Sequence, residues 1–188
     1  GNKIITTGGG GMILTENSDL AEKAKYLTKQ AKDDNVRYIH NEIGYNFRLP
    51  NIQAALGVAQ LGQLPEHLKS KKEIYSYYSK GLKTIMGLKL AEVPDYAQNN
   101  HWLNVLQINK QVYGENHEEL MYRLEKKGVQ TRPVWNLNHV QKPYTNFFNY
   151  NIENAFDLMG TSLCLPSSSM LGKDKINKVI YEISTCHK

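Results

Sequence analysis

The feature that most constrains the fold is the stretch over residues 50–85, which has the pattern of one long helix. Pro50 suits the first turn of a helix, because that turn does not need its backbone N–H. Small and apolar residues then lie on all sides of the predicted helix, which is typical of close packing inside a protein or between subunits. Pro65 should kink or restart the helix, which resumes to about Ile85. The sequence thus predicts a long helix that links two parts of the chain.

The segment near the N-terminus predicts a short hairpin with glycines at its turn. Residues 4–7 and 12–14 have β-type side chains, and Gly8 to Gly11 separate them. Glycine permits positive φ and close approach of another backbone or a ligand. The run therefore fits a phosphate cradle, a tight turn or a close packing contact, and spacing alone does not choose between them.

A helix and a long loop follow the glycine run. Asn17 and Ser18 can cap a helix whose apolar residues keep a helical rhythm to about Ala31. Residues 32–49 lose that rhythm, and ordered loops of this length in a compact protein tend to carry function. The loop ends in aromatic and charged residues, which are Tyr45, Phe47 and Arg48.

Beyond Gly87 the pattern becomes that of a small α+β unit. Strands are predicted at residues 88–90, 103–108, 129–135 and 162–165, and helices at about 116–127, 152–159 and 173–184. Gly128 should end the first of these helices. Ser167 to Ser169 are interpreted only as a loop before the last helix. We place the domain boundary near Gly87, which gives domains over residues 1–86 and 87–188.

The composition is that of an ordinary soluble protein, with 40% apolar and 22% charged residues among 188. No segment approaches the ~18 to 20 uninterrupted apolar residues that span a bilayer, and nothing resembles a signal peptide. We therefore expect a cytoplasmic location and no membrane partner. The net charge of +5 permits attraction to anions, but most lysines lie among acids at helical spacing. Without an arginine-rich tract or an RNA-binding signature, we expect no nucleic-acid partner.

The two cysteines do not predict a metal centre or a disulfide framework. Cys164 and Cys186 lack the spacing of a metal site, and a disulfide framework would use more cysteines. We expect two reduced thiols and no metal.

Lys3 is the first candidate for chemistry. A lysine buried beside a glycine turn can act as a Schiff-base nucleophile when desolvation or a neighbouring cation lowers its pKa. A lysine so near the start of a sequence is far more often a solvated surface residue, because lysine is rarely buried without a partner. The residue alone does not decide between these interpretations.

The wider sequence resembles a known family. NKIITTGGGGMILT, followed by EIGYNFRLPNIQAALGVAQL, closely resembles the DegT/DnrJ/EryC1/StrS family of pyridoxal phosphate-dependent sugar-nucleotide aminotransferases. GVQTRPVWNLNHVQKPY and LCLPSSSML also look like family segments, so the resemblance covers almost the entire chain. It implies an α/β fold, the C-terminal part of a fold-type I transferase. This part would consist of the end of the large cofactor-binding domain, the long linking helix and a small α+β domain.

The resemblance also implies roles for single residues. The family lysine at the position of Lys3 binds the cofactor covalently and then moves protons during amino transfer, whereas some relatives with histidine there are dehydratases. Asn46 matches an asparagine that reaches the cofactor phosphate of the neighbouring subunit, and Arg48 matches a substrate contact across the same interface. Outside this context, Asn46 would cap a turn at Tyr45 and Arg48 would pair with Glu42.

A second segment, TRPVWNLNH, resembles the family stretch in which a histidine and nearby side chains approach the sugar nucleotide. It makes Arg132 and His139 candidates for substrate binding, although a lone histidine is as often a core or surface residue. This chain has residues 136–138, NLN, where many relatives carry a proline, so the loop is expected to differ locally. Trp135 is interpreted as packing, against the protein or the substrate. The glycine run then becomes a tight turn that serves Lys3, since no helix N-terminus follows it immediately.

The resemblance implies that this sequence is a C-terminal fragment. Family members are considerably longer, and their N-terminal half supplies most of the large domain, so this fragment alone should be inactive. The expected reaction transfers an amino group, with glutamate as donor, to a nucleotide-linked 4-keto-6-deoxy sugar in a homodimer. Two alternatives stay open, which are a non-catalytic basic domain that binds an anionic partner and a dehydratase or regulator of the same family.

Overall fold

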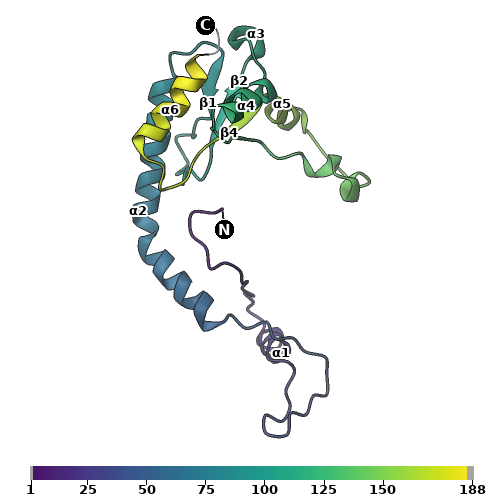
Figure 1. The fold of residues 1–188 in the computed structure, drawn as a ribbon. Coiled ribbons are helices and arrows are strands. Elements are labelled where there is room, and N and C mark those ends of the chain that lie inside the picture. The colour runs from purple at the N-terminus through teal and green to yellow at the C-terminus, as the bar shows by residue number, and fades with distance from the viewer. Residues whose placement is uncertain (1, 186–188) are drawn as a thin grey trace. The chain divides into compact units, whose positions relative to one another are not determined.

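The computed structural model describes residues 2–185 and divides into two compact units, Gly1–Leu64 and Pro65–Lys188 (Figure 1). Helix α2, Asn51–Leu82, contributes to both and continues through Pro65. The predicted long helix is confirmed, and it does not restart at the proline. The boundary placed near Gly87 lies inside the second unit, and the domain organisation stays a prediction. None of the helices in residues 2–185 has the length and apolar character needed to cross a membrane.

The first unit contains one further helix and almost no core. Helix α1 spans Ser18–Thr28, and the Asn17 side chain caps it by accepting a hydrogen bond from Leu20 N at 3.0 Å. Among the described residues of this unit only Ala31 is buried. Large apolar side chains instead face solvent, including Met12, Leu14, Val36, Ile43, Ile52 and Val58. The unit therefore offers apolar surface that another protein surface could cover.

The hairpin predicted at residues 4–14 is wrong, because the structure assigns no strand to either half. Gly8 and Gly10 do adopt positive φ, at 80° and 124°, in local turns closed by threonine side chains. An isolated two-stranded hairpin is only marginally stable in water. The described residues of the first unit contain no third strand that could support it.

The loop after α1 returns to the end of that helix and pairs with it. Tyr45 N donates to Leu27 O at 2.7 Å, and Phe47 N donates to Thr28 O at 3.2 Å. Gln30 N donates to Tyr45 O at 3.0 Å. The prediction of a long ordered loop is thus confirmed, and backbone hydrogen bonds attach its last residues to α1.

The second unit is built on a four-stranded antiparallel sheet with strand order β1-β2-β4-β3. The strands are β1, Leu88–Leu90; β2, Asn104–Ile108; β3, Arg132–Pro133; and β4, Ser162–Leu165. Alternate residues of β2 are buried, as expected for a strand with one face on a core. The strand predicted over residues 129–135 is reduced to β3. The physical reason is that β3 lies at the sheet edge and Pro133 has no N–H to donate.

Four further helices belong to the described part of the second unit. They are α3, Lys110–Tyr113; α4, His117–Lys126; α5, Glu153–Thr161; and α6, Lys173–Ser184, with short 3-10 turns at Asn138–Val140 (η1) and Lys142–Tyr144 (η2). One hydrophobic core contains residues of the sheet, of the second half of α2, and of α4 and α6. The helices contribute Ile74, Tyr78, Leu82, Leu120, Leu124, Ile176, Val179 and Ile183. Helix α6 runs close to α2, since a Cβ on Gly81 would lie 2.5 Å from Ile180 (Figure 1). The predictions of α4, α5 and α6 are confirmed, whereas α3 and the 3-10 turns were not predicted.

The loop after β4 is attached to α2, because three side chains of that helix donate hydrogen bonds to its carbonyls. One of the three donors is Lys71, which is only 5% exposed, and this burial lowers the pKa of its ammonium group. The Ser167 hydroxyl is also buried and accepts from the Asn104 side chain at 2.9 Å. The donor pairs are Ser70 Oγ to Ser169 O (2.6 Å), Lys71 Nζ to Ser167 O, and Tyr78 Oη to Pro166 O (3.0 Å).

The cysteine predictions can be followed for one residue. Cys164 on β4 is a free thiol, and burial raises its pKa. It is therefore a poor nucleophile at neutral pH. Cys186 lies outside the described residues.

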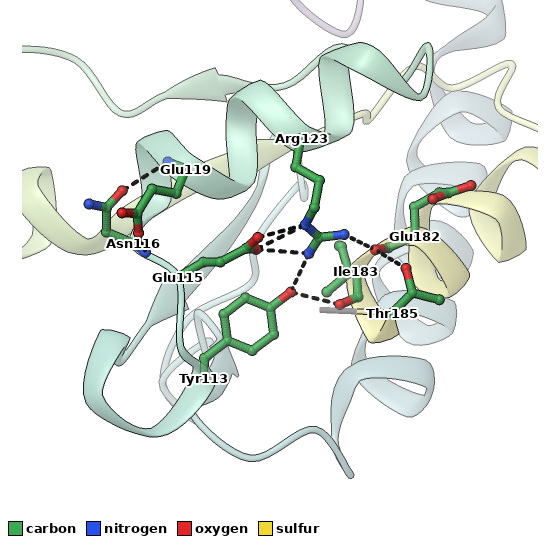
Figure 2. Close-up of polar contacts among 8 residues, drawn as sticks. All are labelled: Tyr113, Glu115, Asn116, Glu119, Arg123, Glu182, Ile183 and Thr185. Carbon is green, nitrogen blue, oxygen red and sulfur yellow. Dashed lines mark hydrogen bonds and ion pairs between the residues drawn. The ribbon is translucent and has the colours of Figure 1, made fainter. Parts of the chain in front are cut away.

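Arg123 joins α4 to the end of α6 (Figure 2). Its guanidinium group binds the Glu115 carboxylate through Nε at 2.8 Å and Nη2 at 2.9 Å. Nη1 donates to Glu182 O, and Nη2 also donates to the Tyr113 hydroxyl at 3.0 Å. That hydroxyl donates to Ile183 O at 2.7 Å. Carbonyls of the last turn of α6, which lack helical partners, are satisfied in this way.

Arg123→Ala should destabilise the second unit by about 2–3 kcal/mol, since it leaves a half-buried Glu115 carboxylate without its partner. Tyr113→Phe should cost about 1 kcal/mol, the value of one ordinary hydrogen bond. Urea unfolding followed by tryptophan fluorescence measures both changes. Arg123→Lys, which keeps the charge but not the planar fork, should fall between wild type and Arg123→Ala. Equal stability of all four proteins would contradict the role given to this cluster.

Gly44→Ala should detach the loop from α1, because a Cβ at Gly44 would lie 2.3 Å from Ala31 N. Backbone atoms cannot move aside cheaply, so a cost of about 1–3 kcal/mol is expected. Amide hydrogen exchange should show lost protection at Tyr45 and Phe47. Gly62→Ala is the matched control, since nothing lies within 4 Å of that position and alanine favours a helix. Unchanged protection in Gly44→Ala would refute the proposed constraint.

Candidate functional site

Asn46 and Arg48 line one open groove of about 970 Å³ in the first unit. Its other walls come from residues 10–15, which include the end of the glycine run, and from one face of α1. Two cations, Lys25 and Arg48, line the groove, and no carboxylate does. This charge balance favours an anionic ligand. The groove thus joins two of the site residues predicted from the sequence.

The backbone of the loop directs Asn46 and Arg48 to the same side. Successive side chains of an extended segment point in opposite directions. The rings of Tyr45 and Phe47 stack at 5.0 Å with 19° between their planes, which places both on one side. Asn46 and Arg48 therefore project from the other side, and both are exposed.

The two structural alternatives for these residues do not occur. Glu42 accepts from Lys23 Nζ at 2.5 Å, so the carboxylate proposed as a partner for Arg48 belongs to another ion pair. Within residues 2–185, no hydrogen bond or ion pair is made by the side chain of Asn46 or Arg48. Both groups are available to a ligand.

Lys3 lies outside this groove. It belongs to the first unit, is exposed to solvent, and is absent from the described residues that line the groove. The structure therefore brings Asn46 and Arg48 together but does not add Lys3 to them within one cavity.

Sequence reasoning missed Lys25 and the two aspartates that order the loop. Lys25 shares a face of α1 with Ala21 and Thr28, and the helical spacing of these residues could have indicated a common wall. The backbone N–H of Asn41 and the Tyr26 hydroxyl donate to Asp33, at 2.8 and 3.0 Å.

Hydrogen bonds hold the carboxylates of this loop in their charged form. The bond from Asn41 is the main cause that holds the pKa of Asp33 below its ordinary value. The backbone N–H groups of Arg37 and Val36 do the same for the pKa of Asp34. The consecutive Asp-Asp-Asn at residues 33–35 is a turn signal that could have indicated such bonds.

Arg132 and His139 belong to the second unit. Arg132 is exposed on β3, and its Nη1 donates to Thr131 O at 3.2 Å. His139 lies half-buried in η1, and the ring of Phe156 meets it edge-on at 5.3 Å. Its Nε2 atom is buried and has no hydrogen-bond partner among residues 2–185. With the Gln130 amide in the orientation that satisfies its neighbours, its oxygen also accepts from Arg132 Nη2 at 2.8 Å. The unsatisfied polar atom of this pair of residues is therefore Nε2 of His139.

Trp135 is less buried than an interpretation as packing requires. Its side chain is 63% exposed, and its ring stacks on that of Trp102 at 5.6 Å with 26° between the planes. The packing interpretation therefore accounts for one face of the ring only.

Comparisons with known proteins agree on one family. A sequence profile described as the DegT/DnrJ/EryC1/StrS aminotransferase family matches residues 1–184. EpsN of Bacillus subtilis, provisionally named a pyridoxal phosphate-dependent aminotransferase, is 36% identical over 186 residues, which cover 96% of this chain and 47% of that protein. GDP-perosamine synthase of Caulobacter vibrioides is 32% identical over 182 residues, with coverage of 96% and 48%.

Solved structures agree on the fold. The aminotransferase TlmJ from Streptoalloteichus hindustanus has a TM-score of 0.81 at 24% identity, and the match covers 97% of this chain and 49% of that one. DesI, solved in the presence of its TDP-sugar product, has a TM-score of 0.75 at 24% identity, with coverage of 92% and 44%. The predicted α/β fold, that of the C-terminal part of such a transferase, is confirmed.

The chain spans about half the length of the relatives that it matches. Within that half the match is nearly complete, since the family profile extends over residues 1–184. The chain belongs to the DegT/DnrJ/EryC1/StrS aminotransferase family.

Proposed function

We propose that this chain is part of a pyridoxal phosphate-dependent enzyme that transfers an amino group from glutamate to a nucleotide-linked 4-keto-6-deoxy sugar. The observation that carries the proposal is the family match over residues 1–184. The resemblance of NKIITTGGGGMILT to a family segment implies that Lys3 takes the position of the cofactor lysine. Relatives named for nucleotide sugars support the substrate class, among them GDP-perosamine synthase and a Campylobacter jejuni transaminase of a UDP-linked amino sugar. The enzyme would work in the cytoplasm.

The groove of the first unit fits the phosphate of such a cofactor. The Asn46 amide and the Arg48 guanidinium are hydrogen-bond donors without a partner among the described residues, and the groove contains no carboxylate that would repel an anion. When bound, pyridoxal phosphate supplies an electron sink that stabilises negative charge at the reacting carbon. Lys3 would hold the cofactor covalently, and Asn46 would hold its phosphate.

Lys3 also suits proton transfer. A neutral lysine amine is a base and its ammonium form is an acid, so Nζ can remove a proton from one carbon and return it to another. Lysine at this position, rather than the histidine of some relatives, favours transamination over dehydration. Arg48 would bind an anionic group of the substrate and orient it.

A homodimer would explain why Lys3 does not line the groove of its own subunit. Asn46 and Arg48 would serve the site of the neighbouring subunit, as the family resemblance implies, and Lys3 would serve its own. The exposed apolar side chains of the first unit, such as Ile52 at 85% and Val58 at 75%, are consistent with surface that an assembly covers.

Arg132 and His139 would contact the nucleotide sugar. The Arg132 guanidinium makes no ion pair with a carboxylate in the described part of the chain, which suits it to a phosphate group. The partnerless Nε2 of His139 can make a hydrogen bond to a sugar oxygen.

Lys3→Ala should reduce amino transfer about a thousandfold or more, because both the covalent attachment and the proton carrier disappear. The rate is measured as 2-oxoglutarate formed from glutamate, on a protein that carries these residues within the full family length. Lys89→Ala, on the exposed edge of β1, should keep the wild-type rate.

Two results would contradict the proposal. Full activity of Lys3→Ala would remove Lys3 from the mechanism. No transfer by the wild type, together with unchanged affinity of Lys3→Ala for an anionic partner, would instead favour the alternative of a basic binding domain.

A further inference from the structure

Helix α1 ends in a left-handed turn that contains no glycine. Its C-terminal cap is Lys29, and the next two residues, Gln30 and Ala31, adopt positive φ at 70° and 47°. Gln30 N donates to Leu27 O at 3.2 Å, and Ala31 N donates to Tyr26 O at 3.0 Å. These two bonds are those of a Schellman motif, in which glycine is the preferred first residue after the cap. A glutamine lacks the freedom of glycine, so further contacts are needed to hold it in this conformation.

His40 supplies one such contact to Gln30. The ring atom Nδ1 of His40 lies 2.7 Å from Gln30 O. A carbonyl oxygen only accepts hydrogen bonds, so Nδ1 has to carry the hydrogen. The imidazolium form and the Nδ1-protonated neutral tautomer of histidine can both donate in this way. The contact therefore assigns one tautomer to the neutral ring.

The backbone on both sides of His40 is held by Asp33. Asp33 N donates to Ile39 O at 2.9 Å, and Asn41 N donates to the Asp33 carboxylate at 2.8 Å. The Tyr26 hydroxyl donates to the same carboxylate at 3.0 Å and so joins it to α1. Because the two residues that flank His40 are held, the positions that its ring can take are limited.

Gln30 in turn holds the segment that carries Asn46. Gln30 N donates to Tyr45 O at 3.0 Å, and Lys29 and Asn46 form an isolated antiparallel β-bridge. The peptide groups of Gln30 thus join His40 to the residue that precedes Asn46. The Asn46 side chain makes no hydrogen bond in the described part of the chain, so its direction depends on this backbone.

We propose that His40 is a positioning residue for Asn46: its Nδ1–H group holds the left-handed Gln30, and Gln30 holds the backbone from which Asn46 projects. The hydrogen bonds define this geometry, whereas its effect on the cofactor phosphate rests on the proposed function. His40 is absent from the described residues that line the groove of Asn46 and Arg48. It therefore acts through the backbone and not by contact with the ligand.

The first test measures amide hydrogen exchange on the 188-residue chain. His40→Ala removes the donor, so the amides of Tyr45 and Phe47 should exchange about three- to tenfold faster, as expected for the loss of one hydrogen bond. His40→Asn keeps an N–H donor on Cγ, as Nδ1 is in histidine, and should retain wild-type exchange. His40→Gln moves the donor one bond further away and should exchange like His40→Ala. His67→Ala, on α2, is the matched control and should leave both amides unchanged.

The second test follows the cofactor on a protein that carries these residues within the full family length. Because Asn46 would hold the phosphate, His40→Ala should weaken the apparent affinity for pyridoxal phosphate about three- to tenfold. His40→Asn should restore this affinity. At saturating cofactor, kcat and the borohydride-trapped adduct on Lys3 should match those of the wild type, since Lys3 is unchanged. A purely structural role of His40 would instead lower kcat at every cofactor concentration.

Several results would overturn the proposal. One is unchanged exchange at Tyr45 in His40→Ala, and another is equal acceleration in His40→Ala and His40→Asn. A neutral His40 ring that carries its hydrogen on Nε2, detected by imidazole nitrogen NMR, would also contradict it, as would faster exchange without loss of affinity in an enzyme that binds the cofactor. Failure of the proposed function is distinguishable, because the wild type would then form no adduct on Lys3. Exchange at Tyr45 would still respond to His40→Ala and would support the positioning of Asn46.

Discussion

Burial of apolar surface is concentrated in one part of this chain, and the remaining features depend on that distribution. The second half of α2 enters the core through Ile74, Tyr78 and Leu82, whereas its first half exposes Ile52 and Val58. Because apolar burial is the main favourable contribution to folding, the second unit can hold its shape with its own side chains. The first unit relies on backbone pairing between residues 45–47 and the end of α1.

That pairing positions the candidate site. Gly44 brings the loop within contact of the α1 terminus, and the extended backbone that follows turns Asn46 and Arg48 to the same side. The side chains of the candidate site are thus positioned by main-chain hydrogen bonds rather than by a packed core. In the second unit a buried side chain positions the backbone instead, since Lys71 donates to Trp102 O from within the core.

Local signals predicted the helices and the loop well. Asn17, Gly128 and the apolar rhythm of residues 173–184 are governed by neighbours in sequence, so α1, α4 and α6 were found near their observed ends. The predicted hairpin at residues 4–14 failed because strands need partners that local sequence does not supply. Pro133 shortened the strand of β3 in a way that its sequence could have indicated.

The candidate site was predictable in part. Asn46 and Arg48 were found through the resemblance of GYNFR to a family segment, and the structure places both in one groove. Lys25 was missed, because its place in the groove depends on residues 10–15 and 46–50, which are separated from α1 in sequence. The stacking of Trp135 on Trp102 is of the same kind, since the two residues lie 33 positions apart in the sequence.

The central claim is that Lys3 is the residue that binds pyridoxal phosphate. The most direct measurement is borohydride reduction after incubation with the cofactor, followed by peptide mapping, on a protein that carries these residues within the full family length. Reduction fixes the cofactor to the amine that it has bound. The account predicts a stable adduct on Lys3. No adduct on a correctly folded protein, or adducts spread over exposed lysines such as Lys89 with Lys3 unmodified, would contradict it.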